Sequence, residues 1–222
     1  PGEVPSRYLA FSGMPRPVIF WNLTDRCNLS CVHCYSRSGP GHDITGELTT
    51  GEALDLIDDL ARSGIALILF SGGEPLLRHD LWELARHARD RGIRTALSTN
   101  GTLIDTEIAG KIRESGIGYV GISLDGATAA THDRFRGTPG AFDLSIAAFS
   151  HCLDSGVRCG VRVTLTRENA GELGALIDLA RRIVASRFCL YWLVPSGRGG
   201  EGYARLQLGS QEVQDALDLL YR

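Results

Sequence analysis

The sequence predicts an α/β protein built on a parallel sheet of six strands. Short apolar runs of strand length alternate with amphipathic segments of helical periodicity along most of the 222 residues, and this alternation is typical of βαβ units. Polar side chains and glycines directly follow several of the apolar runs, at the strand ends where α/β proteins hold their ligands. We therefore expect one domain whose functional site lies at the carboxyl ends of its strands.

Each predicted element has a local signal. Strands are expected at residues 18–24, 65–70, 93–97, 118–124, 157–165 and 188–194, where apolar residues run together. Helices are expected at residues 49–62, 81–91, 105–114, 142–153, 172–184 and 210–222, where apolar residues recur at helical spacing. Thr49 and Glu52 have the spacing of a capping box, and Asp105 is the expected N-cap of the third helix.

The pattern divides the chain into three parts. Residues 1–16 hold three prolines and two glycines without periodicity, which predicts a loosely packed arm. Residues 17–195 carry the alternating strands and helices. Residues 196–222 are expected to form a mobile glycine-rich linker and a final helix.

Composition excludes several classes of function. Hydrophobic residues make up 43% of the chain and charged residues 22%, as in ordinary globular proteins. A net charge of −3 gives no support for a nucleic-acid partner. No apolar run approaches the roughly 20 residues of a membrane span, and the start of the sequence lacks a signal-peptide pattern. We therefore expect a cytoplasmic protein with no membrane partner.

Three of the six cysteines form a motif. Cys27, Cys31 and Cys34 follow the first apolar run with C-x3-C-x2-C spacing. Structural zinc takes four closed ligands, whereas a four-iron cluster held by three cysteines keeps one iron open for a non-protein ligand. The alternatives are inert buried cysteines, or a zinc site that borrows His33 or a distant cysteine. The other three cysteines lie in apolar contexts and are expected to be small buried side chains: Cys152, Cys159 and Cys189.

Polar groups and glycines end the next three strands. Gly72-Gly73-Glu74-Pro75 follows the second strand, where adjacent glycines allow backbone to approach a ligand and a carboxylate can accept from an ammonium group. Short polar side chains end the third and fourth strands: Ser98, Asn100, Ser123 and Asp125. These residue types suit ligand hydroxyls and carboxylates, although they also form ordinary turns and helix caps.

The cysteine spacing followed by the aromatic Tyr35 resembles the radical S-adenosylmethionine (SAM) superfamily. The resemblance implies a partial (βα)6 TIM-like barrel, which agrees with six predicted strands. It also implies that the three cysteines hold a [4Fe-4S] cluster and that SAM binds the fourth iron. Reductive cleavage of SAM in this family gives a 5′-deoxyadenosyl radical that abstracts a hydrogen atom from substrate.

The resemblance also implies the SAM contacts. Glu74 would meet the amino group, and Arg136, in an HDxxRG segment, would pair with the carboxylate. The adenine would lie against the strand ends and the last cysteine. The full implied set is Tyr35, Gly72, Gly73, Glu74, Pro75, Ser98, Asn100, Ser123, Asp125, Arg136, Val163, Thr164 and Leu193. The segment around Arg136 could instead be an exposed loop with solvated charges, and the apolar positions would be core in any fold.

Within the superfamily, the segments PVIFWNLTDRCNLSCVHCYS, ILFSGGEPLLRHDL and STNGTLID resemble the NirJ family of haem d1 biosynthesis and its AhbC and AhbD relatives. This resemblance implies propionate removal from 12,18-didecarboxysirohaem and a flavodoxin- or ferredoxin-type electron donor. Arginines in loops are candidate partners for substrate carboxylates: Arg37, Arg78, Arg134 and Arg198. The family carries a second, C-terminal cluster, but no cysteine follows Cys189 here, so no ligands for it are present.

Two other readings remain open at this point. A radical SAM enzyme with a peptide or coprohaem substrate would keep the same SAM chemistry. An iron–sulfur electron carrier or a zinc protein would bind no SAM, although such a protein has no need of a ligand-binding barrel.

Overall fold

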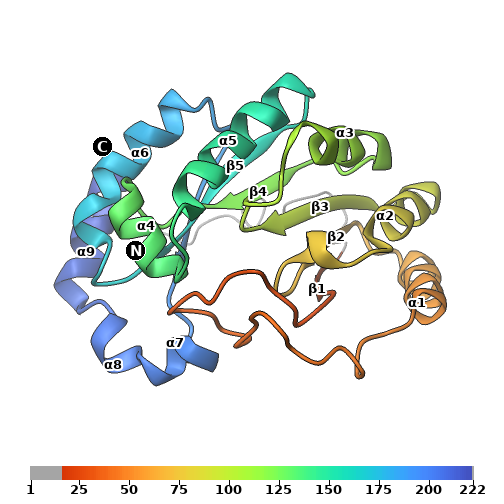
Figure 1. The fold of residues 1–222 in the computed structure, drawn as a ribbon, viewed down its shortest axis with the longest axis horizontal. Coiled ribbons are helices and arrows are strands. Elements are labelled where there is room, and N and C mark those ends of the chain that lie inside the picture. The colour runs from red at the N-terminus through yellow and green to blue at the C-terminus, as the bar shows by residue number, and fades with distance from the viewer. Residues whose placement is uncertain (1–16, 222) are drawn as a thin grey trace, which may run out of the picture.

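The computed structural model describes residues 17–221, so the arm predicted for residues 1–16 lies outside the described residues. Six parallel strands pair in the order β1-β2-β3-β4-β5-β6. They are β1 (Val18–Asn22), β2 (Leu67–Ser71), β3 (Arg94–Thr99), β4 (Val120–Ser123), β5 (Cys159–Leu165) and β6 (Phe188–Trp192). The sheet curls into a half-barrel, as predicted, with helices around its outer side (Figure 1).

Helices connect the successive strands. The crossover helices are α1 (Thr50–Arg62), α2 (Leu81–Asp90), α3 (Thr106–Ser115), α4 (Ala129–Arg136), α5 (Ala141–Asp154) and α6 (Leu173–Arg182). After β6 follow α7 (Gly197–Glu201), α8 (Tyr203–Leu206) and α9 (Ser210–Leu220), and two short 3-10 turns, η2 (Pro75–Leu77) and η3 (Ala170–Glu172), follow β2 and β5.

The predicted caps start their helices. Thr49 accepts from the Glu52 backbone N–H, while the Glu52 carboxylate accepts from the Thr49 N–H at 2.8 Å, so both halves of the capping box are present. The Asp105 side chain accepts from the Ile108 N–H at 2.8 Å at the start of α3. Local hydrogen bonding visible in the sequence therefore fixes both helix starts.

Strand alternation separates the core from the barrel interior. On β5, Val161, Val163 and Leu165 are buried in the core beneath the helices. Arg162 and Thr164 lie between them and point to the opposite face, because successive side chains of a strand alternate. The same alternation turns polar side chains of β2, β3 and β4 into the barrel.

Two stretches differ from the elements expected from sequence. Residues 129–136 form α4 rather than an exposed loop, with Thr128 as N-cap, and Gly137 of the HDxxRG segment is the C-cap. His132, Phe135 and Arg136 of this helix are buried. The glycine-rich stretch after β6 contains two short helices, α7 and α8, whose few apolar residues gave no helical periodicity.

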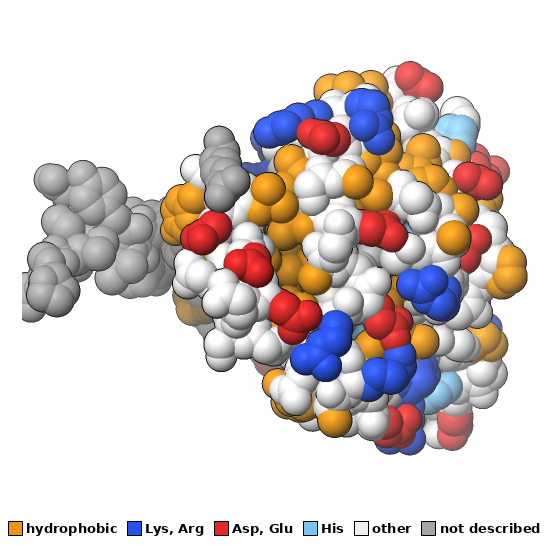
Figure 2. Space-filling view, turned by 90° about the vertical axis from the view of Figure 1, so that its left-hand side faces the viewer, with side chains coloured by type: hydrophobic (Ala, Val, Ile, Leu, Met, Phe, Trp, Pro, Cys, Tyr) orange, Lys and Arg blue, Asp and Glu red, His pale blue; other side chains and the backbone are white. Residues whose placement is uncertain are grey.

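The other three cysteines, the charged surface and the helix lengths can be compared with what the sequence predicts. Cys152 and Cys159 lie in the hydrophobic core, as predicted, while Cys189 on β6 is partly buried. Acidic and basic side chains are interspersed on the face that carries α4, α6 and α9, without a patch of one sign (Figure 2). Among residues 17–221, no helix combines the length and apolarity needed to cross a membrane.

Candidate active site

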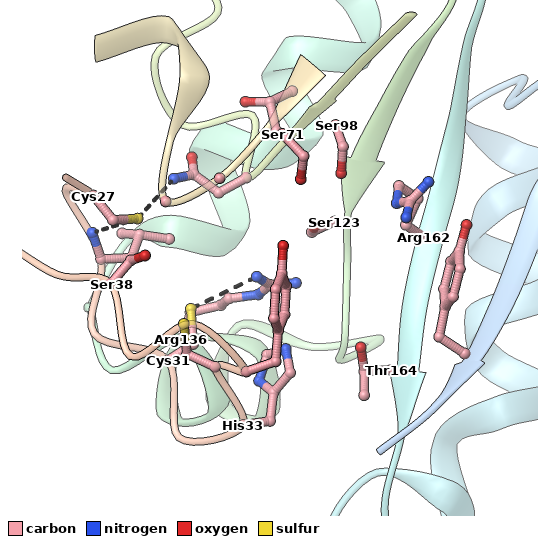
Figure 3. A pocket seen from close by; sticks show the side chains of 18 of the residues that line it. Cys27, Cys31, His33, Ser38, Ser71, Ser98, Ser123, Arg136, Arg162 and Thr164 are labelled. Carbon is pink, nitrogen blue, oxygen red and sulfur yellow. Dashed lines mark hydrogen bonds between the residues drawn. The ribbon is translucent and has the colours of Figure 1, made fainter. Parts of the chain in front are cut away.

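A cavity of about 340 Å³ opens at the carboxyl ends of the strands (Figure 3). It is the place where the cysteine loop, the end of α4 and the last inward-facing residues of the sheet meet. The structure brings these sequence-predicted residues to its lining: Cys27, Cys31, Cys34, Tyr35, Gly72, Gly73, Ser98, Asn100, Ser123, Arg136 and Thr164. Five others do not line it: Glu74, Pro75, Asp125, Val163 and Leu193.

The three cysteines of the motif are free thiols on one loop between β1 and α1. The loop is held at its start by the Cys27 N–H, which donates to the Gly39 carbonyl at 3.2 Å, and in its middle by the Val32 N–H, which donates to Phe135 of α4 at 3.0 Å. Cys27 and Cys31 are buried and Cys34 is partly buried. The motif is therefore anchored to the barrel on both sides while its sulfurs face the cavity.

Hydrogen-bond donors already surround the sulfur atoms. The Leu29 N–H donates to Cys27 Sγ at 3.4 Å, and Arg136 Nη1 donates to Cys31 Sγ at 3.6 Å. Burial nevertheless raises the pKa of Cys27 to about 11, and it raises the pKa of Cys31 as well. These thiols stay protonated at neutral pH unless a cation is bound to them.

The donor set fits an iron–sulfur cluster better than a single metal ion. Within residues 17–221, no three His, Cys, Asp or Glu side chains converge closely enough to hold one metal ion. A cluster does not require such convergence, because each cysteine binds a different iron. Donors to sulfur and a buried arginine beside Cys31 are the surroundings that stabilise thiolate ligands.

Gly72 and Gly73 let the cysteine loop pack against the end of β2. Gly72 has φ of +129°, and a side chain at Gly73 would place its Cβ 2.2 Å from the Arg26 carbonyl oxygen. The Gly73 N–H donates to Thr24 at 2.7 Å, and the Glu74 N–H donates to Arg26 at 2.8 Å. The pair leaves bare backbone in the cavity wall, where a ligand can approach closely.

Glu74 points away from the cavity and into the protein. Its carboxylate accepts from Thr99 Oγ1 and from the Asn100 N–H, both at 2.8 Å, and from the Leu76 N–H at 3.1 Å. Burial raises its pKa to about 7, against the lowering effect of these hydrogen bonds. In this geometry the Glu74 carboxylate does not reach the cavity, so it does not provide the expected direct contact with the SAM amino group. Glu74 instead joins the end of β2 to the end of β3, and Pro75 begins η2 behind it.

Three serines form the polar wall of the cavity. Ser71, Ser98 and Ser123 come from β2, β3 and β4, and Figure 3 shows them along one side of the pocket. Their hydroxyls make no hydrogen bond to any other side chain or backbone group between residues 17 and 221. They are available to the hydroxyl, amino or carboxylate groups of a ligand.

A buried ion pair lies beneath the cavity. Asp125 is completely buried, pairs with Arg136, and accepts from the Thr164 N–H at 2.7 Å. Asn169 donates to the Asp125 carbonyl at 2.9 Å, which completes its surroundings. Arg136 reaches the cavity, and its buried Nε has no partner among the described residues. Asp125 thus positions Arg136, whose guanidinium lines the cavity and suits a carboxylate ligand.

Alternation and register decide which residues of β5 and β6 face the cavity. Val163 belongs to the core, whereas its neighbour Thr164 faces the cavity. After β6, Val194 lines the cavity in place of Leu193. The sequence predicts the correct strands here, but it does not fix which side chains of β5 and β6 face the cavity.

Several lining residues are not among the SAM contacts expected from the sequence: Phe20, His33, Ser71, Arg162, Tyr191 and Trp192. Arg162 could have been found by counting two residues back from Thr164 along the same strand face. His33 stacks on Phe135 with ring centroids 4.4 Å apart, and burial lowers its pKa well below its ordinary value. It therefore lines the cavity as a neutral ring.

Of the four loop arginines proposed for substrate, only Arg198 lines this cavity. Arg78 is buried in contact with Asp80, and Arg37 pairs with Glu201. Arg198 donates to the carbonyls of Cys31 at 2.7 Å, Arg37 at 3.1 Å and Ser38 at 2.7 Å. These hydrogen bonds to the cysteine loop occupy the Arg198 guanidinium.

Comparison with known proteins identifies this arrangement. A sequence model described as "Radical SAM superfamily" matches residues 21–180, which include the end of β1, the cysteine loop and the whole of strands β2 to β5. The chain belongs to the radical SAM superfamily. Membership implies SAM and a [4Fe-4S] cluster, and the cavity has the thiols, donors and bare backbone that fit them.

Curated relatives include proteins named for tetrapyrrole products and a "Mycofactocin maturase MftC" of Mycobacterium tuberculosis, which is 39% identical over 206 residues and covers 91% of this chain and 51% of that protein. The chain is 45% identical over 218 residues to "Fe-coproporphyrin III synthase" of Methanosarcina barkeri, covering 98% of this chain and 54% of that protein. It is 41% identical over 208 residues to "Pre-heme d1 synthase" of Dinoroseobacter shibae, covering 94% of this chain and 51% of that protein. The chain thus spans about half the length of these relatives.

A solved structure supports the fold. Streptococcus suis SuiB bound to S-adenosylmethionine matches with a TM-score of 0.76 and 16% identity, covering 92% of this chain and 46% of that chain. At this identity the likeness shows the shared partial barrel and nothing finer.

Proposed function

We propose that this chain is the SAM-binding half-barrel of an enzyme that modifies side chains of an iron tetrapyrrole in haem d1 biosynthesis. Its substrate would be 12,18-didecarboxysirohaem, from which propionate side chains are removed. The observation that carries the substrate class is the identity of 45% and 41% to proteins named for Fe-coproporphyrin III and pre-heme d1, over more than nine-tenths of the chain.

In this proposal, Cys27, Cys31 and Cys34 are the cluster ligands. The cluster and SAM together would supply an electron and a carbon-centred radical for hydrogen abstraction. The remaining SAM contacts come from the cavity wall: bare backbone at Gly72 and Gly73, the Ser98 and Ser123 hydroxyls, Asn100, Thr164 and Tyr35. Arg136 would meet the SAM carboxylate with the part of its guanidinium that lines the cavity.

Other residues would act from behind this wall. Glu74 and Asp125 position Asn100 and Arg136, Pro75 begins the turn that buries Glu74, and Val163 and Leu193 support their cavity-facing neighbours. A flavodoxin- or ferredoxin-type protein would deliver the electron. A second cluster would need ligands from outside these residues, because no cysteine follows Cys189.

Turnover of the proposed substrate tests this function. The reconstituted protein is incubated anaerobically with SAM, dithionite and 12,18-didecarboxysirohaem, and the tetrapyrrole is analysed by mass spectrometry. Loss of propionate side chains to give pre-haem d1 is the expected result. SAM cleavage with unchanged tetrapyrrole would overturn the proposed substrate and leave the radical SAM assignment intact.

A second candidate is formation of Fe-coproporphyrin III. It is favoured by the higher identity, 45% against 41%, and by coverage of 98% of the chain. The same experiment separates the two functions, because pre-haem d1 and Fe-coproporphyrin III differ in mass.

A further inference from the structure

Arg162 is built into the wall of the cavity on the side away from the cysteine loop. It lies on β5 beside Ser123 of β4 and faces the barrel interior. Its neighbour Gly121 has no side chain, and a Cβ there would lie 2.4 Å from Arg162 Cδ. The aliphatic part of the Arg162 side chain therefore lies over Gly121 of β4, in space that a side chain at position 121 would fill.

The guanidinium of Arg162 is held by an aromatic ring rather than by an acid. Its central carbon lies 4.3 Å from the centroid of the Tyr191 ring, which is the geometry of a cation–π contact. Within the described part of the chain, Arg162 forms no ion pair. By contrast, Arg136 pairs with Asp125 and Arg198 is bound to three carbonyls. Arg162 is thus the cavity arginine whose donors remain available to an anionic ligand.

Aromatic side chains of both edge strands also line the cavity. Phe20 of β1 is 69% exposed, and Tyr191 and Trp192 of β6 are 37% and 43% exposed. These two strands are the edges of the sheet, so the aromatic residues border the gap in the half-barrel. Exposed aromatic faces grouped at a cavity mark a surface for a flat apolar ligand.

This region lies across the cavity from the cysteine loop and borders Ser123 and Thr164, at the far end of the groups that suit SAM. Figure 3 shows Cys27 and Cys31 at one side of the pocket, Arg162 at the other, and Ser123 between them. A ligand at the cysteine loop and a second ligand at Arg162 can therefore share the cavity from opposite sides.

We propose that Arg162, Phe20, Tyr191 and Trp192 form the substrate subsite, and that it takes a flat aromatic macrocycle bearing a carboxylate. The ring lies against the aromatic residues in the gap between β1 and β6, and a carboxylate pairs with the Arg162 guanidinium. This proposal rests on the proposed tetrapyrrole function and names the residues that bind the substrate.

A binding titration tests the subsite independently of turnover. The reconstituted protein with bound SAM is titrated with Fe-coproporphyrin III and with its uncharged tetraamide, and binding is followed by the change in tetrapyrrole absorbance. Arg162→Gln should weaken binding of the tetracarboxylate by about 10- to 100-fold, as expected for one lost charged hydrogen-bonding partner. It should leave the affinity for the tetraamide nearly unchanged.

Two further variants keep the test decisive. Arg162→Lys retains the charge without the planar fork and should fall between wild type and Arg162→Gln. Arg167→Gln changes an exposed arginine just beyond β5 that faces Glu212, and should bind both probes as wild type does. SAM affinity and 5′-deoxyadenosine formation without tetrapyrrole should be equal in all four proteins, which shows that the barrel is folded.

The outcomes separate this inference from the proposed function. If wild type binds Fe-coproporphyrin III and Arg162→Gln binds it equally well, the subsite is wrong and the tetrapyrrole function stands. If wild type cleaves SAM but binds neither probe, the subsite is wrong, and turnover of 12,18-didecarboxysirohaem decides the proposed function. If Arg162→Gln weakens both probes equally, the carboxylate pairing is wrong.

Discussion

At the scale of single residues, the cavity is made by side chains that others hold in place. Glu74 and Asp125 are buried carboxylates that lie outside the lining, and each orients a lining residue, Asn100 and Arg136 respectively. Burial of these two carboxylates is tolerated because their oxygens accept hydrogen bonds or form an ion pair. The motifs therefore combine residues that meet a ligand with residues that position them.

The pH dependence of stability reports on Glu74. Its pKa is raised from an ordinary 4.5 to about 7, with burial as the main cause. Between these values the folded protein keeps a proton that the unfolded chain has released, so the free energy of unfolding falls as pH rises. The total decrease is about 3 kcal/mol, and it is complete above pH 7. Glu74→Gln removes the titrating group, so its free energy of unfolding should lack this decrease. The wild type should therefore become less stable relative to the variant as pH rises from 4.5 to 7.

Urea unfolding of both proteins from pH 4.5 to 7.5 measures the difference. Glu83→Gln, which changes an exposed acid on α2, is the matched control and should follow wild type. Parallel curves for wild type and Glu74→Gln would contradict a raised pKa at Glu74.

Sequence reasoning identified residue types better than side-chain directions. The cysteines, Gly72, Gly73, Ser98, Ser123 and Arg136 lie at the cavity because strand ends of a parallel sheet meet at one edge. Val163 and Leu193 do not line it, because a shift of one residue along a strand turns a side chain to the other face. Arg162 was not predicted, although strand alternation places it on the same face as Thr164; the room for its side chain beside Gly121 becomes visible only when the strands are paired.

At the scale of elements, α7 ties the end of the sheet to the cysteine loop. Gly199 packs so closely that a Cβ would lie 2.8 Å from the His33 carbonyl oxygen. The Ser196 hydroxyl donates to the Tyr35 carbonyl at 3.1 Å, and Arg198 binds three further carbonyls of the loop. The segment after β6 is therefore part of the structure that fixes the cysteines.

Removing Arg198 should loosen the predicted cluster ligands. Arg198→Ala loses donors to Cys31, Arg37 and Ser38, and the reconstituted chain should release iron to a chelator about 10-fold faster, the effect of roughly one lost charged hydrogen bond. Arg198→Lys should rescue little, because a single ammonium cannot span three carbonyls. Arg205→Ala on α8, which pairs with Glu168 instead, is the control. Equal release rates for Arg198→Ala and wild type would remove Arg198 from the support of the loop.

Periodicity and caps predicted most elements well. The capping box of α1, the Asp105 cap of α3 and the six strands come from local patterns of a few residues. Helix α7 depends on contacts with a loop about 160 positions away, such as that of Arg198 with Cys31, and α8 contacts the segment after β5, where Leu206 accepts from the Arg167 N–H. Local sequence carries no signal for such contacts.

At the scale of the whole molecule, a half-barrel leaves one side of its cavity open. The sheet edges β1 and β6 border this opening, and the cysteine loop closes the cavity at the carboxyl ends of the strands. The arrangement lets a large ligand enter from the side while a smaller ligand is held against the loop. Since the chain spans about half of its curated relatives, catalysis by the whole protein can also draw on residues outside it.

The most direct measurement compares two triple variants after anaerobic reconstitution with iron and sulfide. Wild type and the variant with Cys152, Cys159 and Cys189 replaced by alanine should each hold about four irons per chain and form 5′-deoxyadenosine from SAM on reduction with dithionite. Replacing Cys27, Cys31 and Cys34 by alanine should abolish both iron binding and nucleoside formation. Full iron content in that second variant, or loss of iron from the first while it remains folded, would contradict the assignment of the cysteine loop as the cluster site.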